Sequence, residues 1–410
     1  MFKHSLHYLI SNVANASVPF ILLPFLTSSL TTAQYGIIGL FQIMVVNFSA
    51  IIGMGVSGSS SRYYFSSDNR SQAEYNFHCI FIIIVSFIIL ATGFYHFSDS
   101  IVKELPKQYV LVALISSFFT VLYQFYLTQL QVRKKSVDYL KVHILFSVSN
   151  VMTCLMLLSL YKHEWVRIYS ILAVVSSFGL VVVFFSFREK LILVCRFKYY
   201  TFYDIIRFGI PLLPHVISLS YINSLDRYAI NSFLGFGDVG IYTVAFQVCL
   251  ALSILFDSFN KAYVPWLYEK LAKPDCSKKN IVKLTYIGFA ILLSLGGVLY
   301  FSLPLVFSSL LSDDYSDAAT VVGILSLAQV FGGMYLLVTN YIFYSKKTDY
   351  LSYASLLTLS FYYVMLYHSI EITSIIDVAY CFLLAKAIHF LLVWLFSMRA
   401  YKMPWFIKLC

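Results

Sequence analysis

The amino-acid sequence predicts an all-α protein that spans a membrane about twelve times, and three observations carry this prediction. The 410 residues are 60% hydrophobic and 18% aromatic, but only 12% are charged. A soluble globular chain carries about 25% charged residues, so this chain has too few charges to cover a water-exposed surface. The apolar residues also form runs of about 18 or more, which are typical of membrane-spanning helices. The basic residues, finally, gather in alternate connecting segments.

Twelve runs are long enough to cross the hydrocarbon layer, because a helix of about 20 residues covers about 30 Å. The first, seventh and eighth runs also contain Pro, Gly, Asn or charged residues. The predicted spans are Leu6–Ser29, Gly36–Val56, Phe77–Phe97, Gln108–Leu130, Val142–Tyr161, Ile168–Phe187, Phe208–Phe233, Gly240–Asn260, Leu284–Leu305, Ala318–Tyr344, Tyr350–His368 and Ile375–Phe396.

The basic residues predict the orientation of the spans. With the N-terminus inside, the inner segments hold 23 of the 29 Lys and Arg residues, and the outer segments hold four. The remaining two, Arg227 and Lys386, fall within spans. Inner segments of membrane proteins carry the excess of Lys and Arg, so we expect a multi-pass protein of a bacterial inner membrane with both termini in the cytoplasm. This topology accounts for the net charge of +10, and no basic domain is left over to bind nucleic acid.

The chain also predicts an internal repeat. Six spans precede a basic stretch at residues 188–207, and six follow it. Because six is even, both halves enter the membrane in the same direction, and an axis along the membrane normal can relate them. In each half a glycine, Gly36 or Gly240, opens the second helix after a short turn. We therefore expect an N-terminal six-helix lobe at 1–187, a cytoplasmic linker at 188–207, and a C-terminal six-helix lobe at 208–410, the two lobes related by a pseudo-two-fold axis.

Polar residues inside the spans are the candidate functional residues, because a charge at the centre of a spanning helix costs about 2.5–3.5 kcal/mol on insertion scales. Asp226 and Arg227 lie in the seventh span with Asn223 and Asn231, at spacings that place all four near one helix face. This face either lines a hydrophilic cavity or forms a local Asp–Arg arrangement in which Arg227 extends to the lipid headgroups.

The twelfth span carries Lys386 midway along its length, too deep for its side chain to reach the headgroups easily. We therefore expect Lys386 to face a cavity. His389 follows one turn later. It is either a hydrogen-bonded histidine of the helix bundle or, with Asp226, a candidate for proton coupling.

Three further candidates lie in the N-terminal half. Asn12 and Asn15 are three residues apart on the first helix, where they either contact substrate or bond a neighbouring helix. Arg62 lies at the inner end of the second helix, where headgroup phosphates are an equally good partner. The sequence contains no metal-binding, nucleotide-binding or catalytic motif, so we expect no catalytic residues, metal or cofactor. Transport would then be driven by a proton or sodium gradient or by the later fate of the substrate.

Several short stretches in four of the predicted helices form a recognisable set. They are Phe208–His215, Asn223–Tyr228, Val239–Tyr242 and Ala245 in the second half, and Gln34–Gly36, Gly53–Gly55 and Ser61–Tyr64 in the first. In these stretches, and in its length and number of spans, the chain resembles one family of transporters, the O-antigen and polysaccharide repeat-unit flippases of the multidrug/oligosaccharidyl-lipid/polysaccharide (MOP) exporter superfamily.

The resemblance implies a substrate and its partners. The substrate would be an oligosaccharide repeat unit linked to undecaprenyl pyrophosphate, carried from the cytoplasmic to the periplasmic leaflet for lipopolysaccharide or a related surface polysaccharide. Partners would be this lipid-linked oligosaccharide, the membrane lipids and the polysaccharide polymerase machinery. Arg227 and Lys386 would bind the head group, since arginine binds phosphate oxygens bidentately and lysine supplies a point charge. Many members of the family have an arginine on the first helix, where this chain has His4 and His7 instead.

Two other functions fit parts of the sequence. A drug/cation antiporter of the same superfamily would need acidic residues deep in its lobes, whereas the deep charges here are mostly basic. An O-antigen polymerase would need a large outer segment for its chemistry. The longest outer segment here, Val306–Asp317, is a dozen residues.

Overall fold

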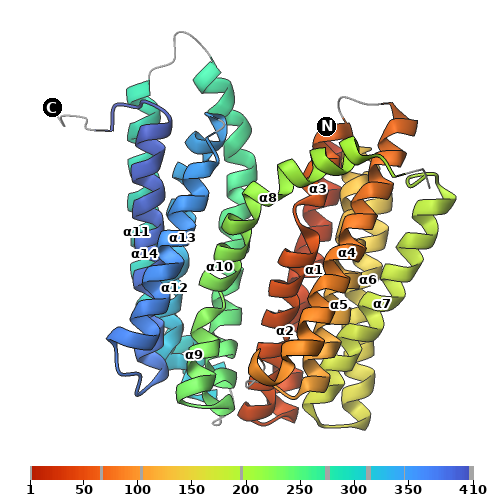
Figure 1. The fold of residues 1–410 in the computed structure, drawn as a ribbon. Coiled ribbons are helices and arrows are strands. Elements are labelled where there is room, and N and C mark those ends of the chain that lie inside the picture. The colour runs from red at the N-terminus through yellow and green to blue at the C-terminus, as the bar shows by residue number, and fades with distance from the viewer. Residues whose placement is uncertain are drawn as a thin grey trace. The chain divides into compact units, whose positions relative to one another are not determined.

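The computed structural model describes residues 2–64, 68–101, 105–193, 197–272, 278–310, 315–345 and 347–405, and within these ranges the regular structure is helical. Figure 1 labels the helices in chain order. The elements are α1 (Phe2–Ser29), α2 (Thr32–Gly53), α3 (Val56–Tyr64), α4 (Asn69–Ile101), α5 (Lys107–Val132), α6 (Ser136–Leu160), α7 (Glu164–Arg188), α8 (Tyr199–Ile222), α9 (Leu225–Phe233), α10 (Phe236–Ala272), α11 (Lys278–Leu310), α12 (Ala318–Tyr344), α13 (Asp349–Val364), the π-helical turn η2 (Met365–Ser369) and α14 (Ile375–Ala400).

The helices confirm the predicted all-α membrane fold. Ten helices of the described chain are long and apolar enough to cross a membrane, and an eleventh span forms if the two bent parts of α8 count together. The remaining predicted span, Tyr350–His368, coincides with α13 and η2, which are continuous in sequence. Each of the twelve predicted apolar runs therefore lies on helical structure.

The seventh predicted span, Phe208–Phe233, is not one helix. It covers the end of α8, a two-residue break at Asn223 and Ser224, and all of α9. Two prolines lie inside α8, Pro211 and Pro214, and its two parts meet at an angle of 40°. Proline lacks the N–H that an inner helical turn needs, which explains a bend at this place. The second span is also interrupted, because Met54 and Gly55 adopt positive φ values of 39° and 69° between α2 and α3.

The chain forms two compact units, residues 1–220 and 221–410. Most of α8 therefore belongs to the first unit, although the sequence placed it at the start of the second lobe. Asp204 of α8 accepts hydrogen bonds from Arg62 at 2.6 Å and from the Tyr75 hydroxyl at 2.9 Å. Ser220, the last residue of the unit, donates to Asn47 of α2. These bonds hold both ends of this part of α8 to the first unit. The expected lobes at 1–187 and 208–410 and the cytoplasmic position of residues 188–207 stay predictions.

The two units share one packing scheme, which supports the predicted repeat. In the first unit α5, the fourth span, packs against α2, α4 and α7. In the second unit α12, again the fourth span, packs against α10, α11 and α14, the counterparts of those three helices (Figure 1). Both fourth spans are the most enclosed helices of their units, with 67% of the apolar stretch of α5 and 72% of that of α12 buried. The symmetry axis that would relate the units stays a prediction.

Candidate functional site

The break between α8 and α9 positions the charged residues of the seventh span. Ile222 ends α8, and Leu225 begins α9 after Asn223 and Ser224. The turn is closed by a hydrogen bond from the Ser224 N–H to the Tyr221 carbonyl at 3.0 Å. Asp226 thereby falls in the first turn of α9, where helix dipole and free N–H groups favour a carboxylate. Its Oδ1 accepts the backbone N–H of Arg227 at 2.8 Å.

Asp226 and Arg227 form an ion pair inside the second unit. The Arg227 Nε lies 3.1 Å from Oδ1 of Asp226, and the two side chains are only 6% and 0% exposed. The other carboxylate oxygen, Oδ2, accepts the Tyr242 hydroxyl at 3.0 Å. Arg227 also donates through Nη2 to the carbonyl of Asn223. Further hydrogen bonds stabilise a buried ion pair, and here they satisfy both oxygens of the Asp226 carboxylate and extend the bonding of Arg227 to the Asn223 carbonyl.

Lys386 reaches the same break from α14. Its Nζ donates to Oδ1 of Asn223 at 2.7 Å. Lys386 is the twelfth residue of the 26-residue α14, about 16 Å from the start of the helix at 1.5 Å per residue. The break therefore lies near the middle of this span. The prediction that Lys386 sits midway along its helix is confirmed, while the cavity that it was expected to face stays a prediction.

Two aromatic rings lie beneath the two cations. The guanidinium carbon of Arg227 lies 3.9 Å from the centre of the Phe246 ring, and Nζ of Lys386 lies 5.2 Å from that of Phe382. The two rings contact each other edge to face, with centres 5.5 Å apart. Cations are attracted to ring faces, and the attraction is strongest away from water. We call Asn223, Asp226, Arg227, Tyr242 and Lys386, with these two rings, the break cluster.

The break cluster carries two cationic side chains and one carboxylate. The carboxylate is already paired with Arg227 and Tyr242, while the ammonium of Lys386 donates to a neutral amide oxygen, that of Asn223. Tyr362 adds a further polar group, since its fully buried hydroxyl has no hydrogen-bond partner among the described residues. The cluster is therefore suited to hold an anionic or polyhydroxylated ligand rather than a cation.

The structure separates some residues that the sequence grouped. Because α9 begins at Leu225, Asn223 does not share a continuous helix with Asn231. The prediction that these two residues lie on one helix face with Asp226 and Arg227 is therefore wrong. The sequence allowed two interpretations of this face, the wall of a cavity or a local Asp–Arg arrangement. The structure contains the local Asp226–Arg227 pair. Arg227 does not extend to the surface in this structure, since it is buried.

His389 lies one turn after Lys386 and is almost completely buried. Its Nε2 is 3.3 Å from the Ser355 hydroxyl, and its ring stacks on Tyr335 with centres 4.8 Å apart. These contacts match the description of a hydrogen-bonded bundle histidine. The part of His389 in proton coupling stays a prediction.

The candidates of the first unit each have a partner within that unit. Asn12 accepts the Tyr139 hydroxyl at 3.1 Å, and Asn15 accepts the Ser147 hydroxyl at 3.3 Å. Both bonds join α1 to α6. The two asparagines therefore bond a neighbouring helix, which is one of the two roles that the sequence left open for them. Arg62, with a half-exposed side chain, pairs with Asp204 and lies 5.1 Å from the Phe208 ring centre. The residues that the sequence proposed are thus divided between the two units.

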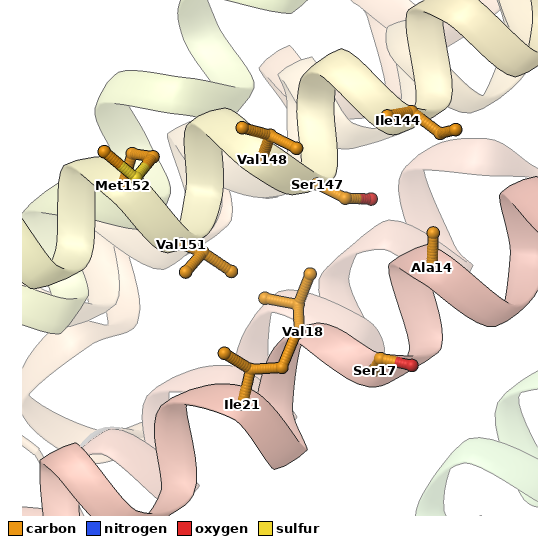
Figure 2. A pocket seen from close by; sticks show the side chains of 9 residues that line it. All are labelled: Ala14, Ser17, Val18, Ile21, Ile144, Ser147, Val148, Val151 and Met152. Carbon is orange, nitrogen blue, oxygen red and sulfur yellow. The ribbon is translucent and has the colours of Figure 1, made fainter.

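An apolar pocket lies beside the two asparagines, between α1 and α6 (Figure 2). Its volume is about 250 Å³, and Ser17 and Ser147 are its polar residues. The other lining residues are Ala14, Val18, Ile21, Ile144, Val148, Val151 and Met152. Such a lining suits a hydrocarbon chain and offers little to a charged head group. Across the described ranges of both units, no group of three or more His, Cys, Asp or Glu side chains could hold a metal ion.

Sequence reasoning missed several buried polar residues. Arg167 was counted among the outer loop charges, but it is buried at the start of α7 and donates to Asn150 at 2.6 Å. Gln72, Asn76 and Gln129 form a buried hydrogen-bonded network with Ser60. Tyr242 belongs to a stretch that carries the family resemblance, and that was the one signal for its position. Nothing in the sequence indicated that its hydroxyl would contact Asp226.

Comparison with known proteins identifies the family. Residues 1–270 match the profile of the polysaccharide biosynthesis protein family. The chain is similar to the Lsg locus putative protein 1 of Haemophilus influenzae, with 26% identity over 370 residues that cover 88% of this chain and 89% of that protein. An uncharacterized membrane protein of the same organism is 24% identical over 380 residues, which cover 88% of each chain.

Solved structures with the same fold come from multidrug transporters. An inward-facing multidrug resistance MATE family transporter of the MOP superfamily superposes with a TM-score of 0.67 at 16% identity, over 96% of this chain and 98% of that chain. An outward-facing structure of a transporter of that family gives a TM-score of 0.64, also at 16% identity, over 97% of this chain and 95% of that chain. The chain therefore belongs to the polysaccharide biosynthesis protein family, and it has the fold of the multidrug resistance MATE transporters.

Proposed function

We propose that this transporter is a flippase for a lipid-linked oligosaccharide. The substrate is one O-antigen or related repeat unit on undecaprenyl pyrophosphate, moved from the cytoplasmic to the periplasmic leaflet of a bacterial inner membrane. The family, named for polysaccharide biosynthesis, supports this substrate class. The excess of Lys and Arg in alternate segments supports an orientation with both termini in the cytoplasm.

The observation that carries the proposal is the excess positive charge of the break cluster. Two cations, Arg227 and Lys386, accompany one carboxylate, Asp226, near the middle of a membrane span. A buried cation is costly in a membrane and is usually kept for function. A pyrophosphate crossing the hydrocarbon layer needs such a cation, because phosphate oxygens form strong charge-assisted hydrogen bonds.

Lys386 and Arg227 contribute differently in this proposal. Lys386 is partly exposed and has a neutral acceptor, so its ammonium is available to the pyrophosphate. Arg227 is buried and its charge is balanced by Asp226, so it becomes a direct ligand only if that pair opens. Asn223 and the buried Tyr362 hydroxyl are candidates for bonds to the sugars.

The remaining candidates support the proposal less directly. Arg62, Asn12 and Asn15 are engaged within the first unit, where they position helices and contact substrate only after those bonds rearrange. Asp226 and His389 are the residues proposed for coupling to a proton gradient. We also propose the polysaccharide polymerase machinery as the recipient of the product.

Deletion of the gene in its native host tests the proposed function. We expect loss of all surface repeats, with complete lipid-linked repeat units retained in the cytoplasmic leaflet. Re-expression of the Lys386→Gln variant should fail to restore them, whereas Lys261→Gln should restore them fully. Lys261 is a matched control because it forms an exposed pair with Asp257 at 2.7 Å. Unchanged surface polysaccharide after deletion would contradict the proposal.

Drug or cation antiport is the second candidate, favoured by the likeness in fold to multidrug resistance transporters. That likeness is at 16% identity and concerns the fold alone. An antiporter deletion strain would keep its polysaccharide and change its sensitivity to cationic drugs. The same strain therefore separates the two candidates. A polymerase is the third function that the sequence left open. It is disfavoured because its chemistry would need a large outer segment, and the longest one predicted here has a dozen residues.

A further inference from the structure

Asn223 is bonded to both cations of the break cluster. Its side-chain Oδ1 accepts Lys386 Nζ at 2.7 Å, and its backbone carbonyl accepts Nη2 of Arg227. The first bond joins residues 163 positions apart in the chain, and the second spans four. Asn223 itself lies in the break and belongs to neither helix. One residue thus supplies a neutral oxygen to each of the two positive groups.

The Asn223 side chain is in a position to be displaced. It is exposed, in contrast to the buried Arg227 and the partly buried Lys386. The bond from Lys386 to Asn223 joins a charged donor to a neutral acceptor, whereas a phosphate oxygen would add the attraction between opposite charges to the same hydrogen bond. A phosphate oxygen brought to Lys386 would therefore replace the amide with a gain in free energy.

We propose that Asn223 is an internal ligand of the break cluster, which occupies Lys386 and Arg227 until an anionic head group displaces it. This inference rests on the proposed function and identifies the residue that regulates the site. In the unloaded protein Asn223 supplies an acceptor to the ammonium of Lys386 and a further acceptor to Arg227, which is already paired with Asp226. In the loaded protein the phosphate takes the Lys386 bond first, because the side-chain amide moves more easily than the backbone carbonyl.

Displacement also affects the chain at the break. Asn223 follows the last residue of α8 and comes three residues after the end of the first compact unit at Ser220. The backbone there is fixed by the Ser224-to-Tyr221 turn and by the bond from Arg227 to Asn223. Loss of the Lys386 bond removes one of the constraints on this turn. Binding of the head group is thereby linked to the freedom of the joint between α8 and α9.

Equilibrium binding of a short prenyl pyrophosphate tests the proposal with the purified full-length protein in detergent. Labelled farnesyl pyrophosphate is the probe, and farnesol, which lacks the charge, is the control ligand. For Asn223→Ala we expect about tenfold tighter binding than for the unchanged protein, because one hydrogen bond to a charged group no longer has to be broken. For Asn223→Asp we expect binding at least tenfold weaker, because the new carboxylate pairs with Lys386.

Asn231→Ala is the matched control, since it removes the same kind of side chain from α9, at a residue that is not part of the break cluster. Its affinity for farnesyl pyrophosphate should be unchanged. A residue that only maintains structure would weaken binding in both Asn223 variants. Equal or weaker binding by Asn223→Ala would overturn the proposal. Should that variant fail to fold, the nearly isosteric Asn223→Asp still decides, because equal or tighter binding would overturn the proposal as well.

Failure of this inference can be told apart from failure of the proposed function. If the unchanged protein binds farnesyl pyrophosphate more tightly than Lys386→Gln does, the cation site stands, and the Asn223 variants alone decide the internal ligand. If the unchanged protein and Lys386→Gln bind equally, including no binding by either, the proposed head-group site is wrong. In that case no head group binds at Lys386 to displace Asn223, and the inference about Asn223 is overturned together with the proposed site.

Discussion

The Tyr242 hydroxyl donates to Oδ2 of Asp226 at 3.0 Å, while the Oδ1 of the same carboxylate faces Arg227. Both oxygens of a fully buried carboxylate are thereby satisfied. Tyr242 comes from α10, the helix that follows α9. It fixes the Asp226 side chain, and through it the direction in which Arg227 points.

Replacement of Tyr242 by phenylalanine should destabilise the protein. The change leaves Oδ2 of a buried carboxylate without its donor, which costs about 1–3 kcal/mol. Thermal unfolding in detergent, followed by tryptophan fluorescence, measures the loss. Tyr362→Phe is the matched control, because the Tyr362 hydroxyl is equally buried and has no partner in the described chain. Equal destabilisation by both variants would contradict this account of Asp226.

Breaking the Asp226–Arg227 pair should cost more than removing both charges. Arg227→Gln alone leaves an uncompensated buried carboxylate, a loss of about 3–5 kcal/mol. The double variant Asp226→Asn with Arg227→Gln carries no such charge and should recover a large part of that loss. A double-mutant cycle on thermal stability in detergent gives the coupling energy of the pair. Additive effects of the two single changes would show that the residues do not interact.

Lys386→Gln should abolish flipping without lowering the amount of folded protein. The change removes the accessible positive charge of the break cluster, while glutamine retains a donor for Asn223. Lys386→Arg should keep part of the activity, because it keeps the charge in another shape. Membrane protein level and surface polysaccharide in the complemented deletion strain are the two measurements. Normal polysaccharide with Lys386→Gln would exclude this residue from substrate binding.

Alanine at Gly209 should severely destabilise the first unit. A Cβ at Gly209 would overlap the backbone carbonyl oxygen of Met54, in the break between α2 and α3. A backbone atom cannot move aside cheaply, so we expect a loss of about 3 kcal/mol, the upper end of the usual cost of overpacking.

Gly93→Ala is the control for the Gly209 variant. Nothing in the described structure lies within 4 Å of a Cβ at Gly93, which is in α4 of the same unit. Alanine favours the helix there by about 0.5–1 kcal/mol. The two alanine variants should therefore shift the unfolding temperature in opposite directions, and a downward shift of similar size in both would contradict the predicted overlap.

The spans could be predicted from the sequence because the membrane imposes a strong rule. A helix that crosses hydrocarbon needs about 20 apolar residues, whatever it packs against, so hydropathy alone finds α12 at its observed bounds, Ala318–Tyr344. The break at Asn223 and Ser224 could not be predicted in this way. A helix and a broken helix have the same average hydropathy, and the break depends on Arg227 and Lys386 bonding to Asn223.

The sequence predicted the charged residues of the candidate site, but it did not predict the contacts among them. Arg227 and Lys386 could be selected because charge inside a span is rare. Their shared partner, Asn223, depends on the approach of α14 to the break, which no local pattern encodes. Arg167 illustrates the opposite error. Its position at the end of an apolar run indicated a loop charge, but its side chain points inward to Asn150, and sequence does not give the direction of a side chain.

The enclosure of α5 and α12 has a consequence for biosynthesis. Each is made before two of the spans of its own unit, so for a time each lies in the bilayer without its final neighbours. The amides of Gln129 and Gln329 can already bond to earlier elements, because Asn76 and Ser60 precede α5 and Ser253 precedes α12. The sides of α5 and α12 that later pack on α7 and α14 have no such neighbour yet. A ribosome that stalls after α5 or α12 would therefore leave these sides exposed to lipid or to the insertion machinery until α7 or α14 is made.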